Sequence, residues 1–237
     1  MVKPTLFLFD VDGTLAESGT HVDAEVTLLL EHLVMIPGVE LGVVGGGTYD
    51  KIFSQLVRAH RIITHYFSEC GTVYHKKIID REYGNYYLEI YKHDIRQHPQ
   101  YANIQRLVKK ALAFIADVDY NLCGHIVDIR TGIVYISLLG MTADASERCK
   151  FFAHDPRGET RKRLMDVLNT EKNKLGISDS QITISEGGRV GIAIFPTEFD
   201  KVQVLKSFSS DYSQIYFFGD KYDKNGNDHK LINLPRS

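Results

Sequence analysis

The chain has 237 residues, enough for about 1.6 domains of ordinary size, so we expect one large domain or two modest ones. Apolar residues make up 43% and charged residues 24%, which excludes disorder, a collagen-like repeat and a coiled coil as descriptions of the whole chain. With 28 basic and 30 acidic residues, the net charge of −2 does not indicate a nucleic-acid partner. No apolar run approaches the roughly 20 residues that cross a bilayer, so we predict no membrane partner.

The N-terminal part of the chain alternates short apolar runs with stretches of helical periodicity. Apolar runs bounded by turn residues are typical of buried parallel strands, and apolar residues three to four apart are typical of an amphipathic helix. Alternation of strands and helices predicts a parallel α/β sheet. We predict strands at residues 6–9, 41–44, 66–67 and 72–74, and helices at residues 22–34 and 48–57.

The middle of the chain has a different pattern, in which strand candidates come in pairs. The pairs are residues 126–129 with 133–138 and residues 182–184 with 190–195, joined by turn segments that are typical of hairpins. Helices are predicted at residues 104–115 and 160–175, and the parallel pattern then returns with a helical segment at 201–208 and a strand at 215–218. We therefore predict an α/β core of residues 1–85 and 197–237, interrupted by an α+β insert of residues 86–196.

Two carboxylates follow the first predicted strand. Asp10 and Asp12 stand in the segment DVDGT at residues 10–14, at the carboxyl end of a strand, where α/β folds bind ligands. Asp10 is suited to attack phosphorus and form an aspartyl phosphate. Asp12 is suited to give a proton to the leaving oxygen and to take one from the next attacking group. An acidic turn without chemistry is the alternative interpretation.

Two further segments are suited to bind phosphate. Backbone N–H groups of Gly46, Gly47 and Thr48, at the end of the second predicted strand, would hold phosphate oxygens. The alternative is a glycine turn before a helix that Thr48 caps. Lys201, at the start of a predicted helix, would neutralise a phosphate and the Asp10 carboxylate, unless it is an ordinary surface lysine.

Acidic residues also follow the last predicted strand. Asp220 ends the segment FFGD at residues 217–220, and GND follows at residues 226–228. A carboxylate placed beside Asp10 makes a site of hard oxygen ligands that suits Mg²⁺. The metal would offset the repulsion between Asp10 and a phosphate.

Together and in this order, these segments resemble the haloacid dehalogenase (HAD) superfamily of phosphotransferases, and more closely the eukaryotic-type phosphomannomutases. The resemblance runs from about residue 5 to residue 236. It implies a HAD-like Rossmannoid core with an inserted cap domain that sets specificity. The matching segments are FDVDGTL at 9–15, GVVGG at 42–46, FP at 195–196, DK at 200–201, IYFFGDK at 215–221 and GNDH at 226–229.

The resemblance assigns roles to the residues of the site. It implies Asp10 as the phosphorylated nucleophile, Asp12 as the acid and base, and Mg²⁺ held by the Asp10 carboxylate, the Asp12 carbonyl and Asp220. It implies cap arginines that bind the far phosphate of a sugar phosphate. Arg130 matches one of them, and Arg189 is an additional charge near the same place. It also implies a homodimer formed through the cap.

Several family positions are changed in this chain. Gly47 stands where the family has Ser or Thr, Met141 and Cys123 replace arginines, and Gly191 and Ala193 replace a Ser and an Asp that contact the sugar. The core therefore predicts phosphoryl transfer, and the cap predicts altered specificity. We expect conversion of mannose 6-phosphate to mannose 1-phosphate or a related transfer. A phosphatase for another small phosphorylated metabolite and a weakly catalytic or non-catalytic regulatory relative are the alternatives.

Cysteine usage and the chain ends complete the expectations. The three cysteines are far apart and form neither a disulfide framework nor a metal motif, which favours the cytoplasm. The N-terminus lacks a signal-peptide cleavage pattern. The family core continues past the last motif with another strand and helix, so we expect either a truncated C-terminus or an uncovered sheet edge.

Overall fold

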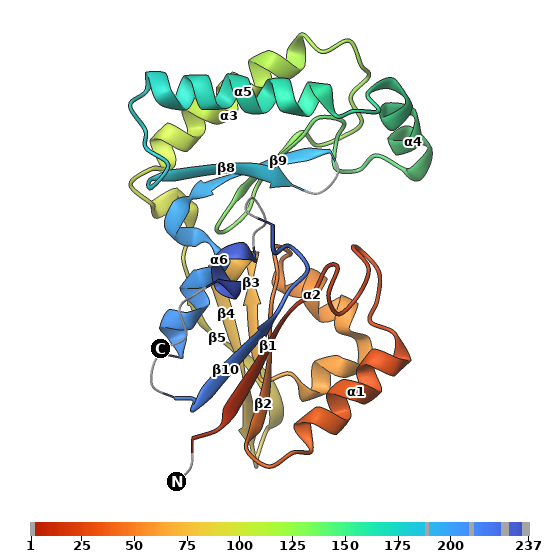
Figure 1. Cartoon of the computed structure of the whole chain (residues 1–237), viewed down its shortest axis with the longest axis vertical. Coiled ribbons are helices and arrows are strands. Elements are labelled where there is room, and N and C mark those ends of the chain that lie inside the picture. The colour runs from red at the N-terminus through yellow and green to blue at the C-terminus, as the bar shows by residue number, and fades with distance from the viewer. Residues whose placement is uncertain (1–2, 188–189, 209–210, 224–227, 234–237) are drawn as a thin grey trace. The chain divides into compact units, whose positions relative to one another are not determined.

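The computed structural model describes residues 3–187, 190–208, 211–223 and 228–233, and it divides the chain into two compact units. The first unit joins Met1–His93 to Phe199–Ser237, and the second, Asp94–Glu198, is inserted between those segments (Figure 1). The boundaries predicted after residues 85 and 196 therefore move to residues 93 and 198. The first boundary moves because β5 (Gly84–Lys92) pairs with β4 (Val73–Asp80) in the sheet of the first unit.

The first unit is built on a six-stranded sheet in the order β10-β1-β2-β3-β4-β5. Strands β10, β1, β2 and β3 are mutually parallel, whereas β4 and β5 run antiparallel to their neighbours. The predicted α/β core with a mostly parallel sheet is confirmed. We did not predict β5, because the spacing of its tyrosines fits a helix as well as a strand. The other strands of this sheet are β1 (Thr5–Asp10), β2 (Val39–Val44), β3 (His65–Ser68) and β10 (Gln214–Phe218).

Helices cover both faces of this sheet, and two apolar clusters result. On one face, α1 (Ala24–Val34) and α2 (Tyr49–Leu56) pack against residues such as Leu41. On the other face, Leu6 and Leu8 of β1 pack with residues of η5 (Lys201–Ser207), a short 3₁₀ helix, and its C-terminal neighbour Phe208. The alternation along β1 thus sends successive side chains into opposite clusters. The remaining short helical segments of this unit are η1 (Val57–Ile62), η2 (Glu69–Gly71) and α6 (His229–Ile232).

The register of the parallel strands brings separate motifs to one edge of the sheet. Asp10 pairs with Val44, which directly precedes the glycine turn, and Phe9 pairs with Phe218, two residues before Asp220. The carboxyl ends of parallel strands lie at the same edge. The residues that follow β1, β2 and β10 are therefore neighbours in space, although more than 200 residues separate the first from the last.

The second unit has a four-stranded antiparallel sheet in the order β6-β7-β9-β8. Both predicted hairpins are confirmed, since β6 pairs with β7 and β8 pairs with β9. Helices α3 (Tyr101–Ala116) and α5 (Glu159–Lys174) lie along one face of the sheet (Figure 1). We did not predict α4, which a capping box of Asp144 and Glu147 starts. The remaining elements are η3 (Ile95–Gln97), β6 (Val127–Ile129), β7 (Val134–Ser137), α4 (Ala145–His154), β8 (Ile182–Gly187), β9 (Gly191–Pro196) and η4 (Thr197–Phe199).

Among the described residues, no helix combines the length and apolar character that a membrane span requires.

Burial predicts which leucines stabilise the first unit. Leu8 of β1 is fully buried, whereas Leu29 of α1 is 66% exposed. We expect Leu8→Ala to lower the free energy of unfolding by about 2–5 kcal/mol, because it removes buried methyl groups and leaves a cavity. Leu29→Ala is the matched control and should change it by less than about 0.5 kcal/mol. Urea unfolding of both variants measures the difference, and equal destabilisation would contradict the assignment of this core.

Candidate active site

Asp10 ends β1 and lies at the centre of the site. It is only 4% exposed, and its Oδ1 accepts a hydrogen bond from Lys201 Nζ at 2.5 Å. Burial raises the pKa of Asp10 to about 6, against the charge of Lys201, which lowers it. The carboxylate is therefore ionised near neutral pH but weakly solvated, as a nucleophile requires.

Lys201 is a buried cation between two carboxylates. It is 1% exposed, so the surface-lysine alternative is wrong. Its Nζ also donates to Asp228 Oδ1 at 2.6 Å. Burial lowers the pKa of Lys201, but the charges of Asp10 and Asp228 outweigh it and raise the pKa above its ordinary value. Asp200 is the N-cap of η5, and its Oδ1 accepts a hydrogen bond from Val202 N. This bond fixes the backbone on both sides of Lys201.

Asp12 follows β1 and is held by three donors. Lys51 Nζ lies 2.6 Å from its Oδ2, and Gln55 Nε2 and Gly19 N lie 2.8 and 3.0 Å from its Oδ1. Burial alone would raise the pKa of Asp12, but the hydrogen bonds from Lys51 and Gln55 lower it below its ordinary value. Asp12 is thus ionised, in the form that accepts a proton.

We did not predict that Lys51 and Gln55 contact Asp12. Both lie on α2, four residues apart, so their side chains project from the same face of the helix. A signal was present in the sequence: α2 begins directly after the glycine turn, at the sheet edge where β1 also ends. The polar face at the start of α2 therefore had to lie near Asp12.

The glycine turn lies between β2 and α2. The carbonyl oxygen of Gly47 accepts a hydrogen bond from Glu69 N at 2.9 Å, which ties the turn to the end of β3. Thr48 is the N-cap of α2, and its Oγ1 accepts from Lys51 N at 3.4 Å. The helix-capping alternative therefore describes the Thr48 side chain. Binding of phosphate by the backbone of Gly46, Gly47 and Thr48 stays a prediction.

Three carboxylates converge at the edge of the sheet. One oxygen each of Asp10, Asp220 and Asp228 lie within 4.8 Å of one another. Asp220 Oδ1 is buried and has no hydrogen-bond partner in the described part of the chain. Mg²⁺ prefers oxygen ligands, and a buried carboxylate oxygen without a hydrogen-bond partner is suited to bind one. These residues therefore fit a divalent cation. Asp228 belongs to this cluster, although we assigned it no role from the sequence.

Gly13 makes room for this cluster. Its φ is +98°, and a Cβ at this position would lie 2.4 Å from Asp220 Oδ2. Both the left-handed backbone and the close approach of Asp220 exclude a side chain. The glycine in DVDGT therefore has a steric function as well as a role in the turn.

The predicted cap residues lie in the second unit. Arg130 follows β6, and its Nε donates to Asp128 Oδ2 at 2.6 Å. The replacement residue Met141 offers a backbone carbonyl that accepts from Arg148 Nη2 at 3.3 Å. Arg189 lies outside the described residues.

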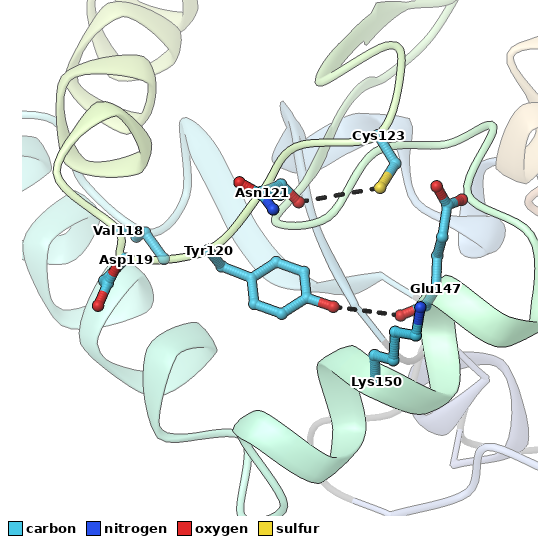
Figure 2. A pocket seen from close by; sticks show the side chains of 7 residues that line it. All are labelled: Val118, Asp119, Tyr120, Asn121, Cys123, Glu147 and Lys150. Atoms are coloured by element: carbon cyan, nitrogen blue, oxygen red, sulfur yellow. Dashed lines mark hydrogen bonds between the residues drawn. The ribbon is translucent and has the colours of Figure 1, made fainter.

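A hollow of about 620 Å³ also lies in the second unit (Figure 2). Its lining contains none of the predicted site residues. The Tyr120 hydroxyl donates across it to the backbone carbonyl of Glu147 at 3.3 Å, as Figure 2 shows. The lining residues are Val118, Asp119, Tyr120, Asn121, Cys123, Glu147 and Lys150.

Solved structures that resemble this chain are phosphatases. An IMP-bound, N-terminally truncated IMP-nucleotidase of Plasmodium falciparum superposes with a TM-score of 0.61 at 13% identity, over 97% of this chain and 62% of that chain. The C-terminal domain of C. albicans trehalose-6-phosphate phosphatase superposes with a TM-score of 0.58 at 14% identity, over 92% and 70%. At these identities the likeness shows the fold alone, which is HAD-like.

Curated relatives are more similar in sequence. Phosphomannomutase 1 of Dictyostelium discoideum is 33% identical over 100% of this chain and 90% of its own length. The phosphomannomutase of Triticum aestivum is 32% identical over 98% and 87%, and phosphomannomutase 1 of Homo sapiens is 31% identical over 98% and 84%. The family profile "Eukaryotic phosphomannomutase" matches residues 30–237. The chain belongs to the eukaryotic phosphomannomutase family.

Proposed function

We propose that this chain is a Mg²⁺-dependent phosphotransferase that converts mannose 6-phosphate to mannose 1-phosphate through an aspartyl phosphate on Asp10. The observation that supports this most strongly is the buried ion pair of Asp10 and Lys201, with Asp12 two residues further on. Such a cluster at the carboxyl edge of a parallel sheet is the place where α/β enzymes bind their substrates. Family membership supplies the sugar phosphate as the substrate class.

The first half of the reaction forms the aspartyl phosphate. An Asp10 oxygen bonds to phosphorus, the bond from phosphorus to the sugar oxygen breaks, and that oxygen takes a proton from Asp12. In the second half, another sugar hydroxyl attacks the aspartyl phosphate and gives its proton to Asp12. Asp12 is ionised and can therefore accept the proton in the second half. It gives that proton to the leaving sugar oxygen in the first half of the following turnover.

The surrounding groups lower the electrostatic barrier between two anions. Lys201 holds one Asp10 oxygen and adds a positive charge where the phosphate must approach. Mg²⁺, held by the carboxylates of Asp10 and Asp220 and by the Asp12 carbonyl, would supply the remaining neutralising charge. Backbone N–H groups of residues 46–48 would bind the reacting phosphate. Arg130 and Arg189 of the second unit would bind the phosphate that is not reacting.

A phosphatase acting on another small phosphorylated metabolite is the second candidate. It is favoured by the second unit, where Met141 replaces a family arginine and Gly191 and Ala193 replace polar sugar contacts. A phosphatase needs only the core site and water, whereas a mutase must bind both ends of a bisphosphate. The buried charges of Asp10 and Lys201 are costly to fold and argue against a purely regulatory relative.

Two broader features belong to the proposal. The family resemblance favours a homodimer formed through the second unit. Cytoplasmic residence is supported by three cysteines that are all free thiols.

A coupled assay separates the two catalytic candidates. Mannose 1-phosphate is supplied with a hexose 1,6-bisphosphate activator, and mannose 6-phosphate and free phosphate are measured in the same reaction. Formation of mannose 6-phosphate supports the mutase, and release of phosphate alone supports the phosphatase. If neither forms beside an active control phosphomannomutase, and a panel of phosphorylated metabolites is also inert, both catalytic candidates are wrong.

Asp10→Asn tests the nucleophile. The amide cannot form the phosphoenzyme, so we expect activity to fall at least about 1,000-fold. Asp23→Asn is the matched control, because Asp23 is an exposed N-cap of α1 and Asn caps a helix equally well. Phosphate release and mutase turnover are measured for both variants. Residual activity of Asp10→Asn near that of the control would show that another residue is the nucleophile.

The pKa of Asp10 predicts an acid limb in the pH profile. Asp10 reacts only when ionised, so kcat/KM should fall on the acid side of about pH 6, by roughly tenfold per pH unit. Because Mg²⁺ competes with the proton for this carboxylate, saturating Mg²⁺ should move the limb to lower pH. Profiles at limiting and saturating Mg²⁺ measure the shift. A limb that does not move with Mg²⁺ would argue against Asp10 as the titrating ligand.

Asp220→Asn tests the metal site. The amide keeps the shape of the side chain but removes the charge of a proposed ligand, so we expect the Mg²⁺ concentration for half-maximal activity to rise at least about tenfold. Asp223→Asn, three residues further along the chain, is the control. Titration of activity with MgCl₂ and calorimetry of Mg²⁺ binding give the values. Unchanged Mg²⁺ affinity would remove Asp220 from the ligand set.

A further inference from the structure

Tyr135 lies on the open face of the sheet in the second unit. Its neighbours on β7, Val134 and Ile136, are fully buried, and successive strand residues point to opposite faces. Helices α3 and α5 cover one face (Figure 1), so the buried pair belongs to the covered face and Tyr135 to the other. Its cross-strand partners, Asp128 on β6 and Ala193 on β9, lie on the same open face.

Two glycines make the space for the Tyr135 ring. A Cβ at Gly187 would lie 2.4 Å from ring atom Cε2, and a Cβ at Gly191 would lie 2.2 Å from the hydroxyl oxygen. Because a Cβ stands out from the sheet, the phenol must lie directly over these two residues. The Tyr135 hydroxyl donates to the carbonyl oxygen of Gly187 at 2.6 Å. The ring is therefore fixed against the sheet at both ends.

Arg130 lies over this ring. Its Cζ is 5.4 Å from the centroid of Tyr135, within range of a cation–π interaction. Its Nε donates to Asp128 Oδ2 at 2.6 Å. The guanidinium is thus oriented by an aromatic face and by a carboxylate, and its side chain remains 25% exposed.

Charged side chains of both signs surround Tyr135. Burial raises the pKa of the Tyr135 hydroxyl, while the charges of Arg130, Arg148 and Arg161 lower it. Arg130 is paired with Asp128, and Arg161 Nη2 lies 2.7 Å from Glu186 Oε2, so carboxylates balance two of these three charges.

We propose that Tyr135 is a positioning residue, which holds the Arg130 guanidinium for the second anionic group of a substrate that carries two. The proposal rests on the proposed function and names its substrate class as small phosphates with a second phosphate or carboxylate. Gly187 and Gly191 belong to the arrangement because any side chain there would displace the ring. A guanidinium held in one plane binds phosphate through two parallel hydrogen bonds and loses less side-chain freedom on binding.

The test compares substrates with one and two phosphates. The ratio of kcat/KM for glucose 1,6-bisphosphate to that for glucose 1-phosphate isolates the contribution of the second phosphate. Tyr135→Leu should lower this ratio about tenfold, since it removes the aromatic face under Arg130. Both values are measured as phosphate released to water, where the single phosphate of glucose 1-phosphate is the reacting one. The kcat/KM for glucose 1-phosphate should then fall much less than that for the bisphosphate, whereas a loss of folding would lower both values together. Tyr135→Phe keeps the ring and should keep the ratio.

A double-mutant cycle tests whether Tyr135 acts through Arg130. In an Arg130→Ala background, Tyr135→Leu should have no further effect on the ratio. An equal effect in both backgrounds, or an unchanged ratio in Tyr135→Leu alone, overturns the proposal. If Tyr135→Leu does not fold, Tyr135→Met replaces it in the same cycle.

A binding experiment separates this proposal from the proposed function. Asp10→Asn is titrated with glucose 1,6-bisphosphate in a calorimeter, with and without Tyr135→Leu. Binding that weakens about tenfold with Tyr135→Leu supports the proposal even if the native chain is inactive. Turnover by the native chain combined with binding that does not depend on Tyr135 overturns the proposal alone. Absence of both turnover and binding overturns both.

Discussion

The site depends on one buried ion cluster, in which Lys201 lies between Asp10 and Asp228. All three side chains are almost fully buried, and each charge is tolerated because the others are present. Removing one partner of a buried pair typically costs about 3–5 kcal/mol, since it leaves an uncompensated charge. Burial at this place raises the pKa of Asp10 to about 6, and Lys201 opposes that rise. Stability and reactivity at this edge of the sheet therefore have a common electrostatic origin.

The cluster draws its residues from both segments of the first unit, on either side of the inserted unit. Asp10 ends β1, whereas Lys201 comes after the whole inserted unit of Asp94–Glu198. The parallel pairing of β1 with β10 brings the last motif back beside the first. A catalytic core completed only after the insert can accept a large change in that insert without loss of its own geometry. In the proposed function, core chemistry and substrate choice would be carried by separate parts of the chain.

The family resemblance implies that most of the changed positions lie in the inserted unit, and that Gly47 is a changed position in the core. The positions of Gly191 and Ala193 carry no polar side chain, and the Tyr135 ring occupies the space over Gly187 and Gly191. An aromatic ring that supports Arg130 favours recognition of charge over recognition of sugar hydroxyls. The proposed function thus gives phosphoryl transfer and specificity different structural determinants, and the proposed experiments address them one at a time.

Local patterns in the sequence determined most of the core. The apolar run before Asp10 predicts β1, and DVDGT, the glycine turn, DK and GD predict which residues gather at its end, because parallel strands share one carboxyl edge. Strand β5 was missed because the spacing of its tyrosines fits a helix as well as a strand. Helix α4 was missed because its apolar pattern is weak. Only the tertiary structure decided that Lys201 is buried, that Lys51 and Gln55 bind Asp12, and that Tyr135 supports Arg130. The contacts of Lys201 with Asp10 and of α2 with Asp12 join residues far apart in the chain, and local periodicity carries no information about a partner at such distances. Arg130 and Tyr135 are close in the chain, but the side-chain conformations that bring the guanidinium over the ring are set by packing on the sheet.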